Sequence, residues 1–237
     1  MQKLIIENLS KSFGEKLVLN GISRTFERGK IYGIIGRNGA GKTTFFNCIN
    51  RDLPIDAGKV VLADEQNTRR QMAFQDVGFV SASPSLPDFL SGFEFIKFYV
   101  RFDQDIKVNS MTDADIHAYF DLIQFDYDDR FQLIKHYSYG MKNKIQLLCC
   151  LVRKPGLLLL DEPLSSFDII VSHEIKQLLY QIKDEHIILM STHLLQLATD
   201  ICDVILLLKD GKLMDATWSR HDKESFEQYI MRELANS

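Results

Sequence analysis

The sequence lacks the excess of positive charge that nucleic-acid-binding proteins usually carry. Its formal net charge is −4 at pH 7. This balance argues against a strongly basic nucleic-acid binder, although it leaves room for a local basic patch. We therefore expect no nucleic-acid partner.

Long apolar runs are also missing. A membrane-spanning helix requires roughly 18 or more consecutive apolar residues, whereas the longest runs here are fragments such as residues 204–208. Residues 1–7 meet a charge too soon to form a signal peptide. If the protein works at a membrane, we expect another subunit to cross it.

The sequence has few cysteines, and none of them forms a C-x-x-C pair. Cys149 and Cys150 are neighbours inside an apolar run. Together with Cys48 and Cys202 they are most simply interpreted as buried free thiols in a reducing compartment. Internal repeats and low-complexity linkers are absent as well. The 237 residues, 46% of them hydrophobic, are enough for one large or two small α/β domains with a sizeable core.

What the sequence does contain is a stretch of the form G-x-x-x-x-G-K-T, set between an apolar strand and a helix. Residues 31–35 predict the strand, and residues 44–49 predict the start of the helix. In a phosphate-binding P-loop the glycines let backbone N–H groups point at phosphate oxygens, and the helix N-terminus adds partial positive charge. A glycine-rich turn that matches by chance is the alternative, which the flanking strand and helix disfavour.

Each residue of this loop has a predicted role in binding phosphate. Lys42 would reach the β- and γ-phosphates, and the Thr43 hydroxyl would ligate Mg²⁺. The predicted nucleotide-binding residues of the loop are Gly36, Arg37, Asn38, Gly39, Ala40, Gly41, Lys42, Thr43 and Thr44.

Two acids follow a second apolar strand. Residues 157–160 predict a buried strand, and Asp161 and Glu162 come at its carboxyl end, the edge at which α/β sheets hold ligands. In P-loop proteins an acid at this point helps to hold Mg²⁺, so Asp161 is a predicted metal ligand beside Thr43. Glu162 is placed to polarise an attacking water as a general base. Solvated acids at a strand end are the alternative interpretation.

A histidine follows the next predicted strand along the chain. Residues 186–190 predict that strand, which continues into Ser191-Thr192-His193. A lone histidine at a strand end is usually structural, but one beside a nucleotide can donate a hydrogen bond to the γ-phosphate. We predict His193, Glu162 and Lys42 as the catalytic residues.

Periodicity and turn residues outline the rest of the chain. Residues 91–135 predict a helical insertion between strands, because Ser91 with Glu94 and Thr112 with Asp115 form potential capping boxes. Other predictions are β structure at 3–28, strands at 59–62 and 77–80, loops at 64–71 and 81–87, a helix capped by Ser138, a hairpin at 204–216 and a helix at 226–234.

Taken together, these motifs resemble the ATP-binding cassette of ABC transporters over nearly the whole chain. Residues 36–44 resemble its Walker A motif, and residues 157–163 resemble its Walker B motif with the catalytic glutamate. His193 resembles its switch histidine. The likeness is greatest to single-cassette subunits of bacterial exporters for peptides, antibiotics or drugs, in which separate membrane subunits form the pathway.

The resemblance also assigns roles to residues whose local pattern says little. Residues 165–168 resemble the family's D-loop, which makes Asp168 a nucleotide-binding residue. Phe13, taken alone, would be interpreted as a core phenylalanine beside a turn. In the family's order of motifs it matches the aromatic residue that stacks on adenine.

Two positions depart from the family pattern. The signature L-S-G-G-Q stands here as residues 137–141, in which Ser138 and Gly140 are kept as predicted nucleotide contacts and Tyr139 replaces the first glycine. The family's glutamine after the strand at 77–80 aligns with Ala82, which cannot ligate Mg²⁺ or position water. These departures bear on coupling to the membrane partner and on the rate of hydrolysis.

The resemblance implies an α/β fold, a P-loop NTPase core with a mixed sheet, an N-terminal antiparallel β part and a helical subdomain at about 85–150. The whole chain, 1–237, would be one ATP-binding domain that ends in a helix at about 223–235. Two cassettes, in a homodimer, would sandwich ATP and Mg²⁺, each site built from one P-loop and the other chain's signature. Membrane-spanning permease subunits would hold the dimer peripherally at the cytoplasmic face of the cell membrane.

Coupling to these subunits and three rival functions complete the expectations. We expect exposed aromatics among Phe89, Phe93 and Phe95 to receive the permease's coupling helix. One rival is a soluble cassette ATPase of DNA repair or translation, and another is a nucleotide sensor with slow hydrolysis, which Ala82 and Tyr139 would favour. The third is a small P-loop kinase, against which the Asp161-Glu162 pair argues.

Overall fold

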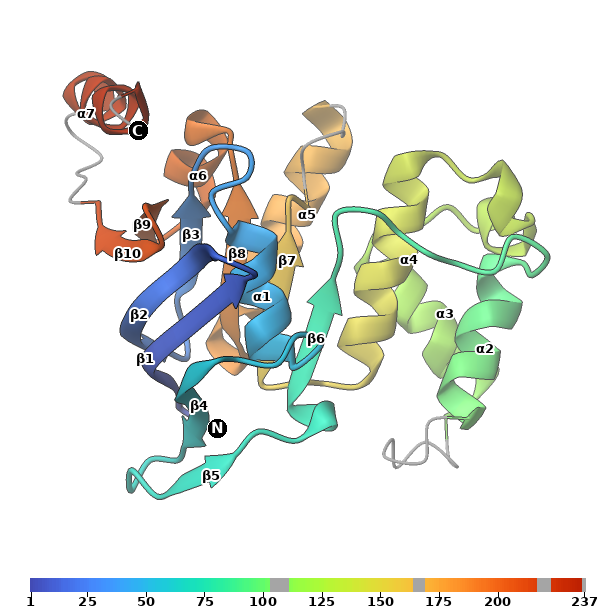
Figure 1. Ribbon diagram of the computed structural model, residues 1–237. Helices are drawn as coiled ribbons and strands as arrows, with labels where there is room; N and C mark the ends of the chain where they lie inside the picture. The colour runs from blue at the N-terminus through green and yellow to red at the C-terminus, as the bar shows by residue number, and fades with distance from the viewer. Residues whose placement is uncertain (103–110, 164–168, 217–222, 236–237) are drawn as a thin grey trace.

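The structure is a computed structural model that describes residues 1–102, 111–163, 169–216 and 223–235 (Figure 1). Its strands are β1 (Lys3–Phe13), β2 (Lys16–Glu27), β3 (Ile31–Ile35), β4 (Ala57–Ala63), β5 (Arg69–Gln71), β6 (Val77–Val80), β7 (Leu157–Asp161), β8 (Ile187–Thr192), β9 (Val204–Lys209) and β10 (Lys212–Asp215). Its helices are α1 (Lys42–Asn50), α2 (Gly92–Phe102), α3 (Asp113–Leu122), α4 (Tyr139–Val152), α5 (Ile169–Ile182), α6 (Leu195–Ile201) and α7 (Lys223–Ala235).

The central sheet has the strand order β10-β9-β3-β8-β7-β6. The strands from β9 to β6 run parallel, and β10 pairs antiparallel with β9 in the predicted hairpin, across a turn at Asp210 and Gly211. All residues of β3 and β7 are buried, as expected for parallel strands that are covered on both faces. The carboxyl ends of parallel strands meet at one edge of the sheet, so the ends of β3, β7 and β8 lie side by side there.

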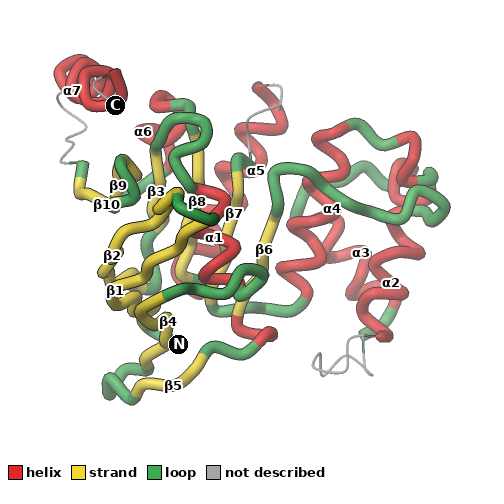
Figure 2. Tube along the Cα trace, in the orientation of Figure 1, coloured by secondary structure: helices red, strands yellow, loops and turns green. Residues whose placement is uncertain are grey.

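Alternate residues of the central strands belong to two hydrophobic cores. In β7, Leu157 and Leu159 pack in a core with Phe45 of α1 and with apolar residues of β1 and β2. Leu158 and Leu160 pack in the other core, with residues of α4, α5 and α6. The sheet is therefore the middle layer of the fold, between the antiparallel sheet with α1 on one face and helices on the other (Figure 2).

The N-terminal β structure forms a four-stranded antiparallel sheet in the order β2-β1-β4-β5. Its last strand, β5, corrects the prediction that residues 64–71 are a loop throughout. All residues of β5 are exposed, and the Arg69 guanidinium donates to Glu7 at 2.6 Å. A short polar edge strand of this kind shows no apolar alternation, so its sequence resembles that of a loop.

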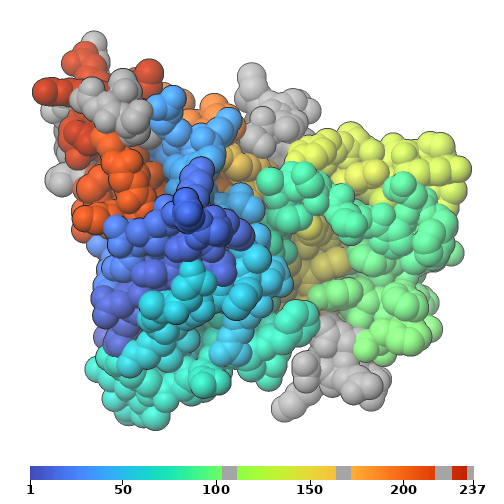
Figure 3. All heavy atoms as spheres, viewed as in Figure 1, coloured from blue at the N-terminus to red at the C-terminus, as the bar shows by residue number. Residues whose placement is uncertain are grey.

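Helices α2, α3 and α4 form the predicted insertion between β6 and β7, at one side of the core (Figures 1 and 3). Both capping boxes are present: the Ser91 and Thr112 hydroxyls accept from the amides of Glu94 and Asp115, whose carboxylates bond back to the cap residues. Helix α4 is buried on almost every side from Asn143 onward, because it packs between β6 and the helices α2 and α3.

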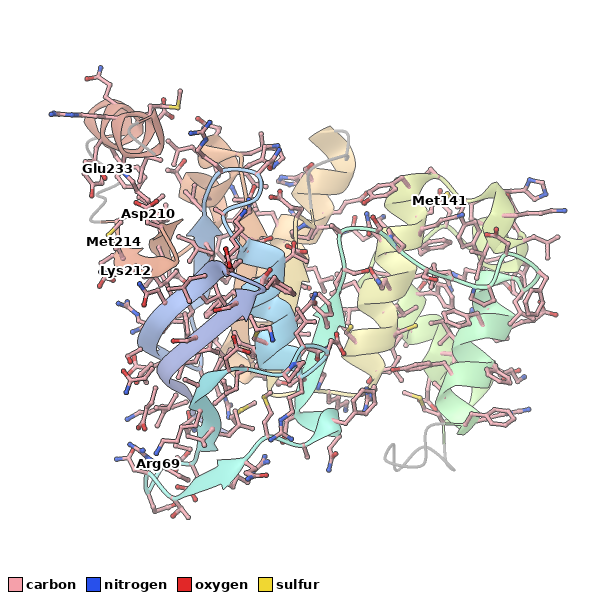
Figure 4. All side chains as sticks on the ribbon, viewed as in Figure 1. Arg69, Met141, Asp210, Lys212, Met214 and Glu233 are labelled. Carbon is pink, nitrogen blue, oxygen red and sulfur yellow. The ribbon has the colours of Figure 1, made fainter. Side chains whose placement is uncertain are left out.

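The C-terminal hairpin and α7 lie at the opposite side of the core from the insertion. Lys209 of β9 donates to the backbone carbonyl of Glu233 in α7 at 2.7 Å, and Figure 4 shows Glu233 close to the hairpin residue Asp210. All four cysteines are buried free thiols, as predicted. Within the described ranges, no helix has both the length and the apolar character needed to span a membrane.

Candidate functional site

The glycine-rich loop joins β3 to α1 and turns in a way that only glycine tolerates. Gly41 has φ 101° and is the N-cap residue of α1. A Cβ atom at Gly41 would lie 2.8 Å from Cγ1 of Val18 in β2, and one at Gly36 would lie 2.8 Å from the Leu208 carbonyl oxygen. The glycines therefore serve both the left-handed turn and the close approach of neighbouring strands. The loop sits at the positive end of α1, where anions bind favourably.

Lys42, the first residue of α1, lies beneath this loop. Its side chain is buried, and its Nζ donates to the carbonyl of Gly36 at 2.8 Å and to that of Arg37 at 3.3 Å. The same Nζ lies 3.4 Å from the Glu162 carboxylate. A cation is thus held between the loop and the acidic end of β7, a position suited to phosphate oxygens that enter from the loop.

The predicted metal ligands are adjacent to each other. The Thr43 hydroxyl donates to Asp161 Oδ2 at 2.7 Å, and Asp161 is 2% exposed. A hydroxyl and a carboxylate are the hard oxygen donors that Mg²⁺ prefers, and Mg²⁺ usually takes only one or two protein ligands beside phosphate oxygens and water. In the described part of the chain no three His, Cys, Asp or Glu side chains gather as a metal cluster. The pair fits Mg²⁺ delivered with a nucleotide.

Glu162 follows β7 with an unusual backbone conformation. Its φ of 49° lies in the left-handed region, which non-glycine residues seldom adopt. Its carboxylate lies 2.9 Å from Nδ1 of His193 and 3.4 Å from Nζ of Lys42. The structure therefore brings together the three residues predicted as catalytic.

A pocket of about 390 Å³ is lined by two of these three residues, Lys42 and Glu162. Its walls come from the loop, from Glu162, and from Phe13 and Lys16, the strand residues on either side of the turn between β1 and β2. The Phe13 side chain is 49% exposed, so it is not the core phenylalanine that its local sequence indicates. Its ring is available at the mouth of the pocket, with Nζ of Lys11 at 5.5 Å from the ring centroid.

The signature residues lie elsewhere in the chain's fold. Ser138 caps α4 by accepting from the Met141 amide at 3.2 Å. Ser138 and Gly140 line a separate pocket with residues of the insertion and Glu174 of α5, near the end of α4 where Figure 4 labels Met141. The structure does not bring them to the P-loop of the same chain. Asp168 lies outside the described residues.

Tyr139 and Ala82, the two residues that depart from the family pattern, contact each other. The Tyr139 hydroxyl donates to the backbone carbonyl of Ala82, in the loop after β6. Gln146, two turns along α4, donates to Ser81 of the same loop at 2.9 Å. The side chain of Tyr139 thus folds back onto its own chain.

Two further contacts were not predicted from the sequence. Ser191 is fully buried, and its hydroxyl donates to Asp161 at 2.5 Å and accepts from the Glu162 amide at 2.9 Å. The sequence offered one indication of Ser191: its position two residues before His193, at the end of a predicted strand.

Of the aromatics considered for docking, Phe89 is 78% exposed, whereas Phe93 is buried and stacks on His117 with ring centroids 4.7 Å apart.

Comparisons with known proteins agree with this geometry. The sequence pattern of the ABC transporter family matches residues 19–165. The chain is 26% identical to the lantibiotic transport ATP-binding protein SrtF of Streptococcus pyogenes, over 97% of this chain and 98% of SrtF. It is 29% identical to the bacitracin transport ATP-binding protein BcrA of Enterococcus faecalis, over 88% of this chain and 67% of BcrA.

A solved structure shows the same fold at low sequence identity. A dimeric ATP-binding cassette in a post-hydrolysis state, bound to ADP and Pi, has a TM-score of 0.76 and 20% identity, and the match covers 89% of this chain and 96% of that chain. Together with the family match, this likeness confirms the predicted α/β fold with a mixed sheet and an N-terminal antiparallel part. The chain belongs to the ABC transporter family and is a single ATP-binding cassette of that family.

Proposed function

We propose that this chain binds and hydrolyses ATP to power the export of a peptide, antibiotic or drug-like substrate through separate membrane subunits. The observation that carries the proposal is the position of Glu162, whose carboxylate lies between Lys42 and His193 at the edge of the sheet. The printed functions of SrtF and BcrA, lantibiotic and bacitracin transport, support the substrate class.

The side chains divide the chemistry among them. The loop amides and Lys42 hold the phosphates, and Phe13 stacks on the base at the mouth of the pocket. Thr43 and Asp161 hold Mg²⁺, which supplies positive charge that offsets the charge of the phosphoryl group. Glu162 orients and deprotonates the attacking water, and His193 donates a hydrogen bond to the γ-phosphate.

Completion of the site calls for a second cassette. Ser138 and Gly140 line a pocket separate from the P-loop pocket. The nucleotide that they are proposed to contact must therefore be bound to the P-loop of another molecule. We take that molecule to be a second copy of this chain. The dimeric state of the solved relative supports this arrangement.

The membrane partner would bind the insertion. Phe89 lies in the loop before α2 and is 78% exposed, so its ring is accessible to a partner. Close by in the sequence, the loop after β6 contacts α4 through Tyr139. A permease helix seated on Phe89 would therefore act on the loop and on α4 together, from the cytoplasmic face of the membrane.

Glutamine at position 162 tests the proposal. In the complex with its membrane subunits, Glu162→Gln keeps the size of the side chain but removes the base, and we expect ATP turnover to fall at least about 100-fold. ATP binding should change little, because the loop and Lys42 are untouched. Glu185→Gln is the matched control, since Glu185 is exposed beyond the amino end of β8.

The same assay separates the rival functions. Equal turnover by the wild type and Glu162→Gln would favour the nucleotide sensor, for which Ala82 and Tyr139 are the supporting features. If ATP turnover persists after the membrane proteins are removed and depends on a soluble partner, the result would favour the soluble cassette ATPase of DNA repair or translation. Co-purification with a membrane protein supports the exporter.

A further inference from the structure

We infer that Ser191 is the positioning residue that holds the Mg²⁺ ligand Asp161 and the general base Glu162 in one fixed arrangement. The inference rests on the proposed hydrolytic function and assigns a role to a side chain outside the predicted site. Ser191 touches neither the pocket nor solvent: its exposed fraction is 0%. It acts through its two neighbours.

The strand register places Ser191 at the centre of the site. Strand β8 lies between β3, which leads into the P-loop, and β7, which ends in the acids. Ser191 is paired with Ile34 of β3 and with Asp161 of β7. A side chain at this position is therefore fixed relative to both functional strand ends.

The hydroxyl uses both of its hydrogen-bonding functions. It has one O–H to donate and lone pairs to accept; it donates to Asp161 Oδ1 at 2.5 Å and accepts from the Glu162 N–H at 2.9 Å. Alanine can do neither, and a thiol is a weak donor and acceptor. One oxygen atom thus links two adjacent acids that have different tasks.

The hydrogen bond from Ser191 uses Oδ1 of Asp161, so Oδ2 is left to face Thr43 and the proposed Mg²⁺ position. Thr43 donates to Oδ2 at 2.7 Å, so the two oxygens of Asp161 have different partners. Thr43 is itself a proposed Mg²⁺ ligand, and its contact with Asp161 must adjust when the metal is bound. The bond to Ser191 does not have to change, and it keeps the carboxylate from rotating.

The bond to the Glu162 amide bears on the left-handed backbone there. With φ at 49°, Glu162 occupies a region that is costly for a residue with a Cβ atom. The hydrogen bond from its amide to Ser191 favours this conformation, which aims the carboxylate at His193 and Lys42. Without the bond, Glu162 is released toward ordinary backbone conformations that point its side chain elsewhere.

The test compares the wild type, Ser191→Ala, Ser191→Cys and Ser191→Thr in the full transporter complex. Loss of a buried hydrogen bond to a charged group predicts a fall in kcat of roughly 10- to 100-fold for Ala and Cys. The Mg²⁺ concentration for half-maximal turnover should rise roughly tenfold, for the same reason. ATP binding measured in EDTA should stay within about twofold of the wild type, because the loop is unaffected. Threonine, which restores the hydroxyl, should recover most of kcat.

Controls separate this inference from its alternatives. Thr199→Val removes another buried hydroxyl, in α6, that donates to the Gln196 carbonyl, and it should leave the Mg²⁺ dependence unchanged. Wild-type kcat and Mg²⁺ dependence in both Ser191→Ala and Ser191→Cys would overturn the inference. A parallel loss of ATP binding in EDTA would also overturn it, since that result indicates a merely structural role. If the wild type itself fails to hydrolyse ATP, the proposed function fails instead.

Discussion

His186 lies just before β8, at the opposite end of the strand from His193, and is 6% exposed. Its Nδ1 lies 2.5 Å from the Pro155 carbonyl, to which it must donate because a carbonyl only accepts. Burial disfavours the charged imidazolium and lowers the pKa of His186 from its ordinary value of 6.5, although the bond to Pro155 opposes the shift. The histidines that flank the two ends of β8 thus have different environments, one buried and one at the site.

The lowered pKa predicts how stability depends on pH. The unfolded chain binds a proton at His186 more readily than the folded chain, so this residue's contribution is complete above about pH 6.5 and is lost as the pH falls further. Relative to His186→Gln, the wild type should lose free energy of unfolding more steeply on acidification, with a difference in slope of at most about 1.4 kcal/mol per pH unit. Urea unfolding between about pH 7.5 and 5.5 measures both slopes. Parallel slopes would contradict the prediction, and His173→Gln, at an exposed histidine of α5, is the control.

At the scale of single residues, the sequence predicted the position of a side chain where a motif encodes that position, and missed it where only the fold determines it. Lys42, Thr43 and Asp161 were predictable because their spacing within strand–loop–helix units places them at one sheet edge. The position of Ser191 was not predictable, because it depends on which strand lies between β3 and β7. Local sequence patterns do not determine the strand order. For Phe13, the local pattern indicated the core, whereas the order of motifs indicated the nucleotide.

Among the elements, α4 and the loop after β6 are joined by two side-chain contacts. Tyr139 begins α4 and donates to the Ala82 carbonyl, while Gln146 donates to Ser81. Both contacts join the helix that carries the signature to the loop that carries the other departure from the family pattern. We therefore expect the loop and the start of α4 to move as one unit.

Removal of the tyrosine hydroxyl tests this link. Tyr139→Phe keeps the ring and deletes one neutral hydrogen bond, which is worth about 1 kcal/mol, so the amides of residues 81–86 should exchange hydrogen roughly fivefold faster. Hydrogen–deuterium exchange read by mass spectrometry reports on this segment directly. Tyr127→Phe, at an exposed tyrosine of the same insertion, is the control and should leave that segment unchanged. Unchanged exchange in Tyr139→Phe would mean that the hydroxyl does not hold the loop.

The sequence predicted elements well where local signals were strong. The capping boxes at Ser91 and Thr112 marked the starts of α2 and α3, since a side chain and an amide three residues apart determine them. Strand β5 was missed because its residues are polar and exposed and only its pairing with β4 makes it a strand. The contact between Tyr139 and Ala82 joins residues 57 positions apart, and no local rule connects them.

For the whole molecule, the separation of Ser138 from the P-loop is the most consequential feature. Within one chain, the loop opens on the pocket beside Glu162, and Ser138 lines another pocket at the start of α4. If both contact the same nucleotide, each complete site takes its loop from one molecule and its signature from the other. A homodimer then has two such sites, related by its twofold axis.

Mixing two inactive variants tests this arrangement. Lys42→Ala removes the phosphate-binding cation and Ser138→Glu places a negative charge where phosphate is expected, so each variant alone should have no intact site. In a mixed dimer, one site combines both defects and the other combines the wild-type loop of one chain with the wild-type signature of its partner. Since random pairing makes half of the dimers mixed, the mixture should recover about one quarter of wild-type turnover. ATPase activity after co-reconstitution with the membrane subunits measures it.

The double variant tests whether recovery of activity requires an intact loop in one of the two chains, or whether pairing of any two chains is enough. A chain with both Lys42→Ala and Ser138→Glu, paired with Lys42→Ala, has no functional loop in any dimer and should stay inactive. A mixture of the single variants that also stays inactive, while the wild type turns over, would contradict the shared site. It would mean that the signature serves a different cassette or does not contact the nucleotide. Recovery would mean that the P-loop with its catalytic residues and the signature serine contact one ATP only after two copies of this chain associate. Each chain alone would then contain half of one site and half of another.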